Sequence, residues 1–540
     1  MADQLEPHTT LNDQPFPELL GLACQAVVSS DGQWLAVSSV MHRYSRIAVY
    51  RTDDLSCAHL LTFTMEAESI AFHPALPLLA VGLDNGDEYS RAGGLTLLEA
   101  DTGHRVDFTD PAWGIDPLRW LDDRTLQLTF FAMDDGIDSR VARATVVRED
   151  WRGLGPDALD LTGLDRTAQD PGDPGEPGTY DDAPPPLQTL RTLAERAGRS
   201  YEEQGAVRAV AGLGDGRVLA TRRDVAVECR GADGSVLWSV PAPSSYGGAR
   251  IEPAADERTV RVAAPGPDSR TRTDFLLVDT ADGRVLDRCS VPFSAAMCVR
   301  TDGVWAIRDT YDRCLGAEPP APPDTPIFAA DGRPLGSLHV ADRYDLVPLD
   351  ARRCPELLFV RGRRDVVALA PDGAPETALF SADAPLGRAV HADDGTGAAL
   401  YHGRTELVRR AFPSGGVQWS RPLESEVISL DTHAGVLHAL CADGTLVSVD
   451  TADGALVATR RLPPHGPLSL HAAPDGAVVV GTAAGQVLRC PPVRVPRDTP
   501  LNGSPRPTGE RVARTACTGS TACPPPCGGE GRLRLPTVLP

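Results

Sequence analysis

The chain contains no lysine: all 52 basic residues, in a sequence of 540, are arginine. A bacterial genome that prefers arginine codons explains this composition. The chemical consequence does not depend on that origin. A Walker-type phosphate loop, a protein kinase, a Schiff-base enzyme and a Ser-Lys hydrolase all require a lysine, so the sequence excludes these classes.

Positive charge is scarce overall. The 52 basic residues stand against 74 acidic ones, which leaves a formal net charge of −22 at pH 7. A general nucleic-acid binder needs a basic surface that displaces counterions from phosphate, and docking on an anionic membrane needs basic clusters. The charge therefore argues against nucleic acid and membrane as partners, and it favours a cationic one.

Long apolar runs and paired cysteines are also lacking. No apolar run approaches the roughly 20 residues of a membrane span, and residues 1–21 have neither the basic nor the apolar region of a signal peptide. The twelve cysteines are scattered singly, mostly in expected strands such as those of Cys229, Cys298 and Cys441. This placement suits reduced thiols in a core better than a disulfide framework, so we expect a cytoplasmic protein.

Catalytic and ligand motifs are missing as well. No G-x-S-x-G occurs, and no histidine lies beside a serine or cysteine in a nucleophile motif. Cys517, Cys523 and Cys527 have no nearby histidine, whereas structural zinc needs four ligands at paired spacing. The acidic run 84–94 lacks the spacing and terminal glutamate of a calcium loop. The sequence thus predicts no catalytic, cofactor-binding or metal-binding residue.

What the sequence does contain is a repeat. In residues 442–462, ADGTLVSVDTADGALVATRRL, two alternating strands are joined by an Asp-Gly turn, which is a strong hairpin signal. The corresponding turn recurs along the chain at Gly234, Gly283, Gly332, Gly373, Gly415 and Gly454. Units of about 40–50 residues with four short strands predict an all-β protein, a β-propeller built from four-stranded blades.

Four segments carry a resemblance to known repeat families. SSDGQWLAVSS (29–39) and LTLLEADTG (95–103) resemble pieces of WD40 repeats, although the Gly-His and Trp-Asp pairs of that family are absent. Trp238 and Trp419 follow the turn in GADGSVLWSVP and PSGGVQWSRP, which resembles the quinoprotein-dehydrogenase-like (PQQ-like) repeat. That resemblance implies that both tryptophans pack between adjacent blades. The adjacent cysteines and export that accompany the quinone cofactor are absent, so no cofactor is expected.

Composition divides the chain into five parts. We expect a lead-in (1–24), three blade units (25–152), an acidic Pro/Gly-rich insertion (153–206), seven further units (207–492) and a disordered tail (493–540). Within the insertion, Leu187, Leu190 and Leu193 follow Pro186 at helical spacing and predict a short helix. Ten units fit one large ring or two rings, and the sequence does not choose between them.

Two functions follow from this architecture. The leading hypothesis is a noncatalytic scaffold that binds a protein partner, and the alternative is a hydrolase or lyase with a metal or acid/base site at the central channel. The long loops 84–94, 265–274 and 308–326 connect second to third strands, so they lie on the same face as the links between blades. Because the insertion is acidic, we expect a cationic partner and salt-sensitive binding there. The candidate contact residues are Asp84, Asp87, Glu88, Asp309 and Asp312.

Overall fold

The structure is a computed structural model that describes residues 8–41, 44–86, 92–134, 138–169, 185–203, 205–266, 272–292, 294–309, 325–338, 346–349, 351–361, 364–369, 377–383, 385–393, 397–463 and 466–493. These residues form ten sheets, antiparallel except for one parallel pair of strands, and one helix, α1 (Pro186–Arg196), at the position that the leucine spacing predicts. The prediction of an all-β protein is confirmed. No helix in the described ranges is long and apolar enough to cross a membrane.

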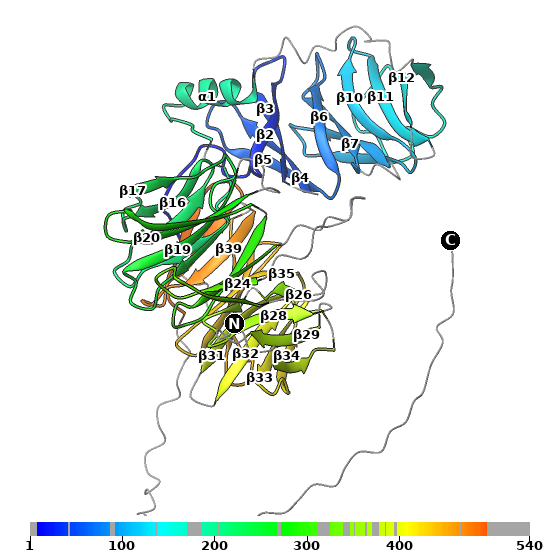
Figure 1. Cartoon of the computed structure of the whole chain (residues 1–540). Coiled ribbons are helices and arrows are strands. Elements are labelled where there is room, and N and C mark those ends of the chain that lie inside the picture. Colours follow the sequence, from blue (N-terminus) through cyan, green and yellow to red (C-terminus); the bar gives the residue numbers. More distant parts are fainter. Residues whose placement is uncertain are drawn as a thin grey trace, which may run out of the picture. The chain divides into compact units, whose positions relative to one another are not determined.

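Three of the sheets follow one another in residues 22–169, which we call the three-sheet segment (blue and cyan in Figure 1). Their strands are β2 (Leu22–Val28), β3 (Trp34–Met41), β4 (Tyr44–Arg51) and β5 (Cys57–Phe63); β6 (Glu66–Phe72), β7 (Leu78–Asp84), β8 (Gly93–Glu99) and β9 (Arg105–Asp110); and β10 (Gly114–Trp120), β11 (Thr125–Asp134), β12 (Asp138–Val147) and β13 (Thr167–Gln169).

Seven more sheets come from residues 210–490 together with the short strand β1 (Thr9–Thr10), and we call them the seven-sheet segment. The strands of the first three sheets are β14 (Val210–Gly212), β15 (Val218–Arg222), β16 (Val225–Arg230) and β17 (Val236–Pro241); β18 (Arg250–Pro253), β19 (Thr259–Pro265), β20 (Thr273–Asp279) and β21 (Val285–Val291); and β22 (Ala295–Val299), β23 (Trp305–Asp309), β24 (Thr325–Phe328) and β25 (Pro334–Leu338). The fourth sheet has β26 (Leu346–Pro348), β28 (Leu357–Arg361), β29 (Asp365–Leu369) and β30 (Thr377–Ser381), and the fifth has β31 (Arg388–Asp393), β32 (Ala398–Gly403), β33 (Glu406–Ala411) and β34 (Val417–Pro422), with β27 (Ala351–Arg352) at the edge. The sixth sheet has β35 (Val427–His433), β36 (Val436–Cys441), β37 (Thr445–Asp450) and β38 (Leu456–Arg461), and the seventh has β39 (Pro467–Ala472), β40 (Val478–Thr482) and β41 (Val487–Cys490) with β1.

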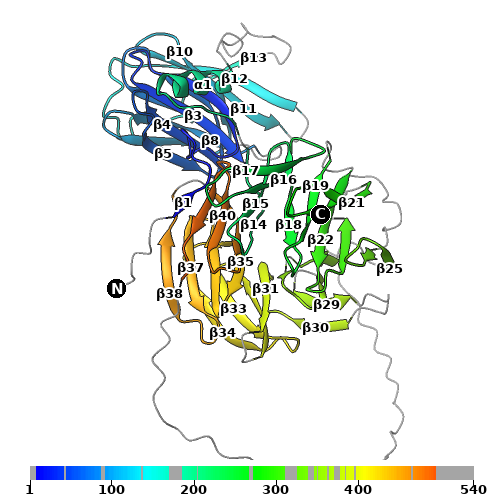
Figure 2. The same ribbon diagram turned by 90° about the vertical axis from the view of Figure 1, so that its left-hand side faces the viewer.

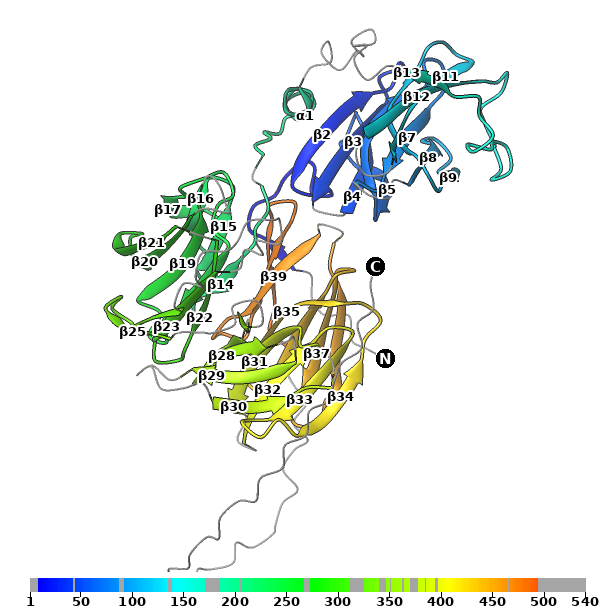
Figure 3. The same ribbon diagram turned by 45° about the vertical axis from the view of Figure 1, so that its right-hand side comes forward.

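The three-sheet segment is a stack with two different outer faces. Successive side chains along β3 point to opposite faces of the sheet: Trp34 and Ala36 face the second sheet, whereas Leu35 and Val37 face outward. That outward face is covered by α1 and by residues 16–19, and Figure 3 shows α1 beside β2. The outward face of the third sheet is more polar: it carries Gln127, Thr129, Arg143 and Thr145 beside the half-buried Phe131 and Val141.

The seven-sheet segment closes on itself. Each sheet shares an apolar cluster with the next one along the chain. The last sheet then packs against the first, since Val479 and Val487 share a cluster with Val210 and Val218. The sequence left open one set of ten units or two sets. In the structure, seven sheets form the closed series and three form a stack.

The first strand of the chain completes its last sheet. Thr9 and Thr10 pair with Arg489 and Leu488, so β1 becomes the fourth strand beside β41 (Figure 2). The Asn12 side chain extends this pairing, because its Oδ1 accepts from the Val487 N–H at 2.8 Å and its Nδ2 donates to the Gly485 carbonyl at 2.6 Å. Composition predicts a lead-in over residues 1–24, but the structure places Thr9 and Thr10 of this range in a sheet.

Candidate functional site

The seven-sheet segment contains a cavity of about 330 Å³ between its first strands. The lining residues come from six of the seven sheets, at or just before β14, β18, β22, β31, β35 and β39, and also from β19 and β27. Small side chains account for much of the wall and leave the space open: Ala209, Ala249, Ala263, Ala295, Ala296 and Ala389.

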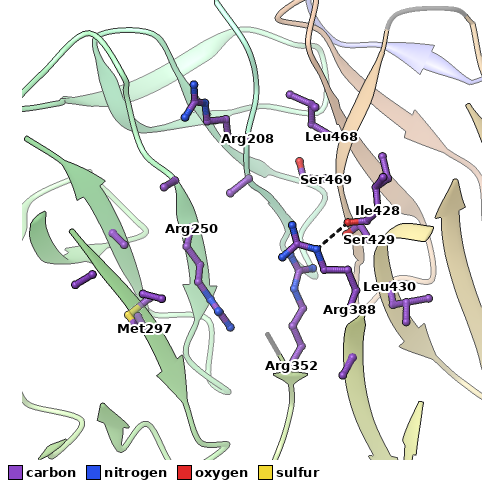
Figure 4. Close-up of a pocket in the computed structure, with 16 residues that line it drawn as sticks. Arg208, Arg250, Met297, Arg352, Arg388, Ile428, Ser429, Leu430, Leu468 and Ser469 are labelled. Carbon is purple, nitrogen blue, oxygen red and sulfur yellow. Dashed lines mark hydrogen bonds between the residues drawn. The ribbon is translucent and has the colours of Figure 1, made fainter. Parts of the chain in front are cut away.

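Four arginines line this space. They are Arg208, Arg250, Arg352 and Arg388, and each comes from a different part of the chain. In Figure 4 the guanidinium groups of Arg250, Arg352 and Arg388 point inward from separate strands. None of the described residues that line the cavity is acidic. In a chain with a net charge of −22, this is a local reversal of charge.

The cavity lies at the end of the strands where links arrive from the preceding sheet. Arg250 and Arg388 are the first residues of β18 and β31, and Arg208 lies just before β14. The second strand of each sheet runs antiparallel to the first, so it ends where the first strand begins, and the connection to the third strand starts at this same end. Ala263, near the end of the second strand β19, therefore also lines the cavity. Arg208 and Arg388 are exposed, so they form the rim.

A loop within the segment closes the other end. β27 lies between β26 and β28 in the chain, but it pairs in parallel with β31 at the edge of the next sheet. From there Arg352 donates to the carbonyl oxygen of Leu470, and Arg353 donates to that of Ala472 at 2.9 Å. Arg353 also lies 3.3 Å from the Asp431 carboxylate, Nε to Oδ1. These contacts tie three sheets together and form the floor of the cavity.

The floor holds a buried charge network. Asp431 is fully buried and accepts from the Ala472 N–H at 2.8 Å. Burial raises the pKa of its carboxyl, but the guanidinium of Arg353, the His471 ring and the Arg352 guanidinium together bring that pKa below its usual value. Burial also lowers the pKa of His471 to about 3. At neutral pH the network therefore holds an ionised aspartate and a neutral histidine.

Asp431, His438 and Ser448 are cross-strand neighbours in sheet β35–β38 and resemble a nucleophile arrangement. His438 Nδ1 lies 2.9 Å from Ser448 Oγ. However, the exposed fractions are 0% for Asp431, 2% for His438 and 1% for Ser448. A substrate cannot reach a hydroxyl buried to this extent, so we assign the three residues to the core of the sheet.

Trp238 and Trp419 each contact the following sheet. The Trp238 indole N–H donates to the Thr280 carbonyl at 3.1 Å, and that of Trp419 donates to the Thr451 carbonyl at 3.0 Å. Each indole also lies over the glycine of the next turn. A methyl group on Gly283 would lie 2.7 Å from the Trp238 ring, and one on Gly454 would lie 2.9 Å from the Trp419 ring. The two residues therefore occupy equivalent positions between sheets.

Sequence reasoning missed other members of this set. The His59 ring lies 2.8 Å from the Ala100 carbonyl oxygen and packs on Gly103, in the arrangement of the two tryptophans. Phe380 packs on the turn glycine Gly415 in the same way. Their place in the repeat is the signal that could have identified them: each residue lies on the fourth strand of its sheet, soon after that strand begins. Because these side chains are a histidine and a phenylalanine, the pattern of tryptophan after the turn does not identify them.

The predicted loop residues are placed only in part. Asp84 ends β7, is 8% exposed, and accepts from the Gly86 N–H at 2.9 Å, so its carboxylate supports the turn that follows the strand. Asp309 is the last residue of β23. Asp87, Glu88 and Asp312 lie outside the described residues, as do Cys517, Cys523 and Cys527. Within the described ranges, no group of three or more His, Cys, Asp or Glu residues could hold a metal ion.

No protein-family model matches the chain, and no curated protein matches it. Among solved structures, the chain is similar to the computationally designed Ika8 protein, with 13% sequence identity over 70% of this chain and 95% of that one, at a TM-score of 0.38.

Proposed function

We propose that the chain is a noncatalytic β-propeller scaffold that binds a protein partner. In this proposal the seven-sheet segment is one ring of seven blades, closed by β1, and the three-sheet segment is an arm of three blades inserted into it. The support is the closed series of contacts between successive sheets and the cavity lined by the first strands of six of them. Such a body presents many loops on a rigid frame, so a broad surface binds with little ordering cost.

The observation that carries the partner-binding role is the placement of the longest connections. The excursion between β1 and β14, residues 11–209, links a fourth strand to the next first strand. The connection between β23 and β24, residues 310–324, joins a second strand to a third. Both classes of connection leave the blades at the same end. One face of the ring therefore carries the arm and the longest loop together, and we assign the partner to this face.

The charge of the acidic Pro/Gly-rich stretch 153–206 indicates the kind of partner. Residues 153–206 contain eleven acidic residues and four arginines. Opposite charge raises the association rate and fixes orientation, and added salt screens it. We therefore propose a cationic protein surface as the partner of this face.

The alternative, a hydrolase or lyase acting at the channel, needs a proton-transfer group that a substrate can reach. Asp431 is fully buried among arginines, and the His471 side chain is 12% exposed with a pKa lowered by burial. Both side chains belong to the buried charge network that forms the floor of the cavity. This favours binding over catalysis.

A pair of loop replacements tests the proposal. In one variant, residues 310–324 become a short Gly/Ser link. In the matched control, the same is done to residues 370–376, which join the third and fourth strands β29 and β30 at the opposite end. We expect the tagged full chain and the control to recover a stoichiometric protein partner, and the first variant to recover less. Failure to recover any partner, or equal loss in the control, would overturn the proposal.

A further inference from the structure

We propose that the arginine-lined cavity is a binding site for a small polyanion that carries phosphate or carboxylate groups. The cavity opens at the same end of the strands as the face assigned to a protein partner, but the anion site does not depend on that assignment, and its test uses anions alone. It rests on three features of the described residues: their charge, the space that they enclose, and the way that the arginines are held.

The charge is the first step. Arg208, Arg250, Arg352 and Arg388 line one cavity, and none of the described lining residues is acidic. Arg250 Nε lies 2.8 Å from Glu252, and Arg352 Nη1 lies 3.8 Å from Asp431, and both of these carboxylates lie outside the lining. Four arginines and no acidic residue among the described lining residues make the wall of the cavity cationic. An anion is the ligand that such a field attracts.

The space is the second step. A volume of about 330 Å³ falls at the lower end of the range for small-molecule sites. The alanine side chains of the wall are small and apolar, so they place little restriction on the shape of a ligand. The guanidinium groups offer planar pairs of N–H donors that match the oxygens of phosphate and carboxylate groups. The site therefore selects for charge and for oxyanion geometry, and its size selects a small ligand over a polymer.

The way the arginines are held is the third step. Arg352 is fixed in the floor by its bond to the Leu470 carbonyl, so its position is set before any ligand arrives. Arg388 Nε donates to the Ile428 carbonyl at 3.1 Å, and its guanidinium group points into the cavity (Figure 4). Arg208 stands exposed at the rim. The site thus combines an arginine fixed in the floor with exposed arginines at the rim.

The test uses isothermal titration calorimetry of the full chain with pyrophosphate and, separately, with citrate, at constant ionic strength. We expect binding of at least one of the two with a stoichiometry near one. Arg208→Gln and Arg388→Gln should each weaken that binding by about tenfold or more, because each removes a charge-assisted contact. The comparison of pyrophosphate with citrate reports which group the site prefers.

Arg258→Gln is the matched control. It removes the same charge, but its side chain is 86% exposed in the turn between β18 and β19, at the other end of the blade. Ala296→Leu fills the cavity while all four arginines remain, so it should abolish binding without lowering the melting temperature of the free protein. No binding of either anion at about 10 mM, or equal weakening by Arg258→Gln, would overturn the proposal.

Discussion

At the scale of single residues, one contact repeats between sheets: a side chain on a fourth strand lies over the turn glycine of the next sheet. Trp238 on Gly283, Trp419 on Gly454 and His59 on Gly103 are examples. These turn glycines have positive φ, +77° at Gly283, which other residues adopt only under strain. The glycine thus supplies both the turn and the flat surface against which the neighbouring side chain packs.

The first prediction concerns this contact. Trp238→Ala removes the indole packing and the bond to Thr280. Because Trp238 is only partly buried, we expect the free energy of unfolding to fall by about 2–3 kcal/mol, below the roughly 3–5 kcal/mol of fully buried aromatic residues. Trp238→Phe, which keeps a ring on Gly283 but loses the hydrogen bond, should lose about 1 kcal/mol. Urea denaturation measures both, and unchanged stability of the Ala variant would contradict the inter-sheet role.

The second prediction is a pH dependence. Burial lowers the pKa of His402 and of His438 to about 4, against 6.5 for an unperturbed histidine. Between pH 6.5 and 4 the unfolded chain therefore binds more protons than the folded one, so stability falls as the pH falls through this window. At pH 5 we expect a loss on the order of 1–2 kcal/mol for each histidine, relative to pH 7.5. Urea midpoints at the two pH values measure it.

His402 offers a matched variant for that measurement. Its Nε2 accepts from Arg410 Nε at 3.0 Å, so the ring must be neutral at this nitrogen in the folded state. His402→Gln keeps an acceptor but cannot titrate. The variant should therefore lose less stability between pH 7.5 and 5 than the unaltered chain does. An identical pH profile for the two would show that His402 does not contribute.

At the scale of elements, the pieces that complete the fold are short. β1 has two residues, and its pairing with β41 is reinforced by the Asn12 side chain. The helix α1 buries Leu190 and Leu193 against the outward face of the first sheet of the three-sheet segment. Each piece covers groups that would otherwise meet water: the free edge of β41 in one case and an apolar sheet face in the other.

The third prediction tests the closure by β1. Asn12→Ala leaves the Val487 N–H and the Gly485 carbonyl without their side-chain partner at a position that is 8% exposed. We expect a loss of about 2–3 kcal/mol, since two buried backbone groups lose a hydrogen bond. Asp13→Ala is the control, because Asp13 is 77% exposed and pairs with Arg199 at the surface. If both variants melted alike, the closure would not depend on Asn12.

At the scale of the whole molecule, the three-sheet segment is an insertion whose two ends meet. Gln14 Nε2 donates to the Ala484 carbonyl, and the Val207 N–H donates to the Thr482 carbonyl, so both ends of the excursion lie at one turn. The chain leaves the seven-sheet segment after its first strand and returns beside the place where it left. The closure of the seven sheets therefore does not require the intervening residues.

The fourth prediction follows from this geometry. A chain in which residues 15–206 are replaced by a short Gly/Ser linker should keep the seven-sheet segment folded, with one cooperative unfolding transition. Hydrogen exchange should show strands β14 to β41 protected as in the full chain. If the shortened chain lacked a cooperative transition, the three-sheet segment would be an obligatory part of the same core.

Local pattern was enough to predict the strands, the turns and the helix. Alternation in 445–450, the Asp-Gly turns and the leucine spacing of 187–193 each depend on neighbours a few residues apart, and the structure contains the corresponding elements β37, the turn at Gly454 and α1. The position of Trp238 and Trp419 after the turn is also a local property. Repetition of these patterns was sufficient to indicate an all-β chain of four-stranded units.

Only the tertiary structure decided which units close on one another and what lies at their centre. Two threonines near the start of the chain carry no strand pattern, and they become a strand because β41, far along the sequence, offers an unpaired edge. Arg208, Arg250, Arg352 and Arg388 likewise look like isolated charges in the sequence. They form one site because the first strands of successive sheets converge, and no local periodicity records that convergence.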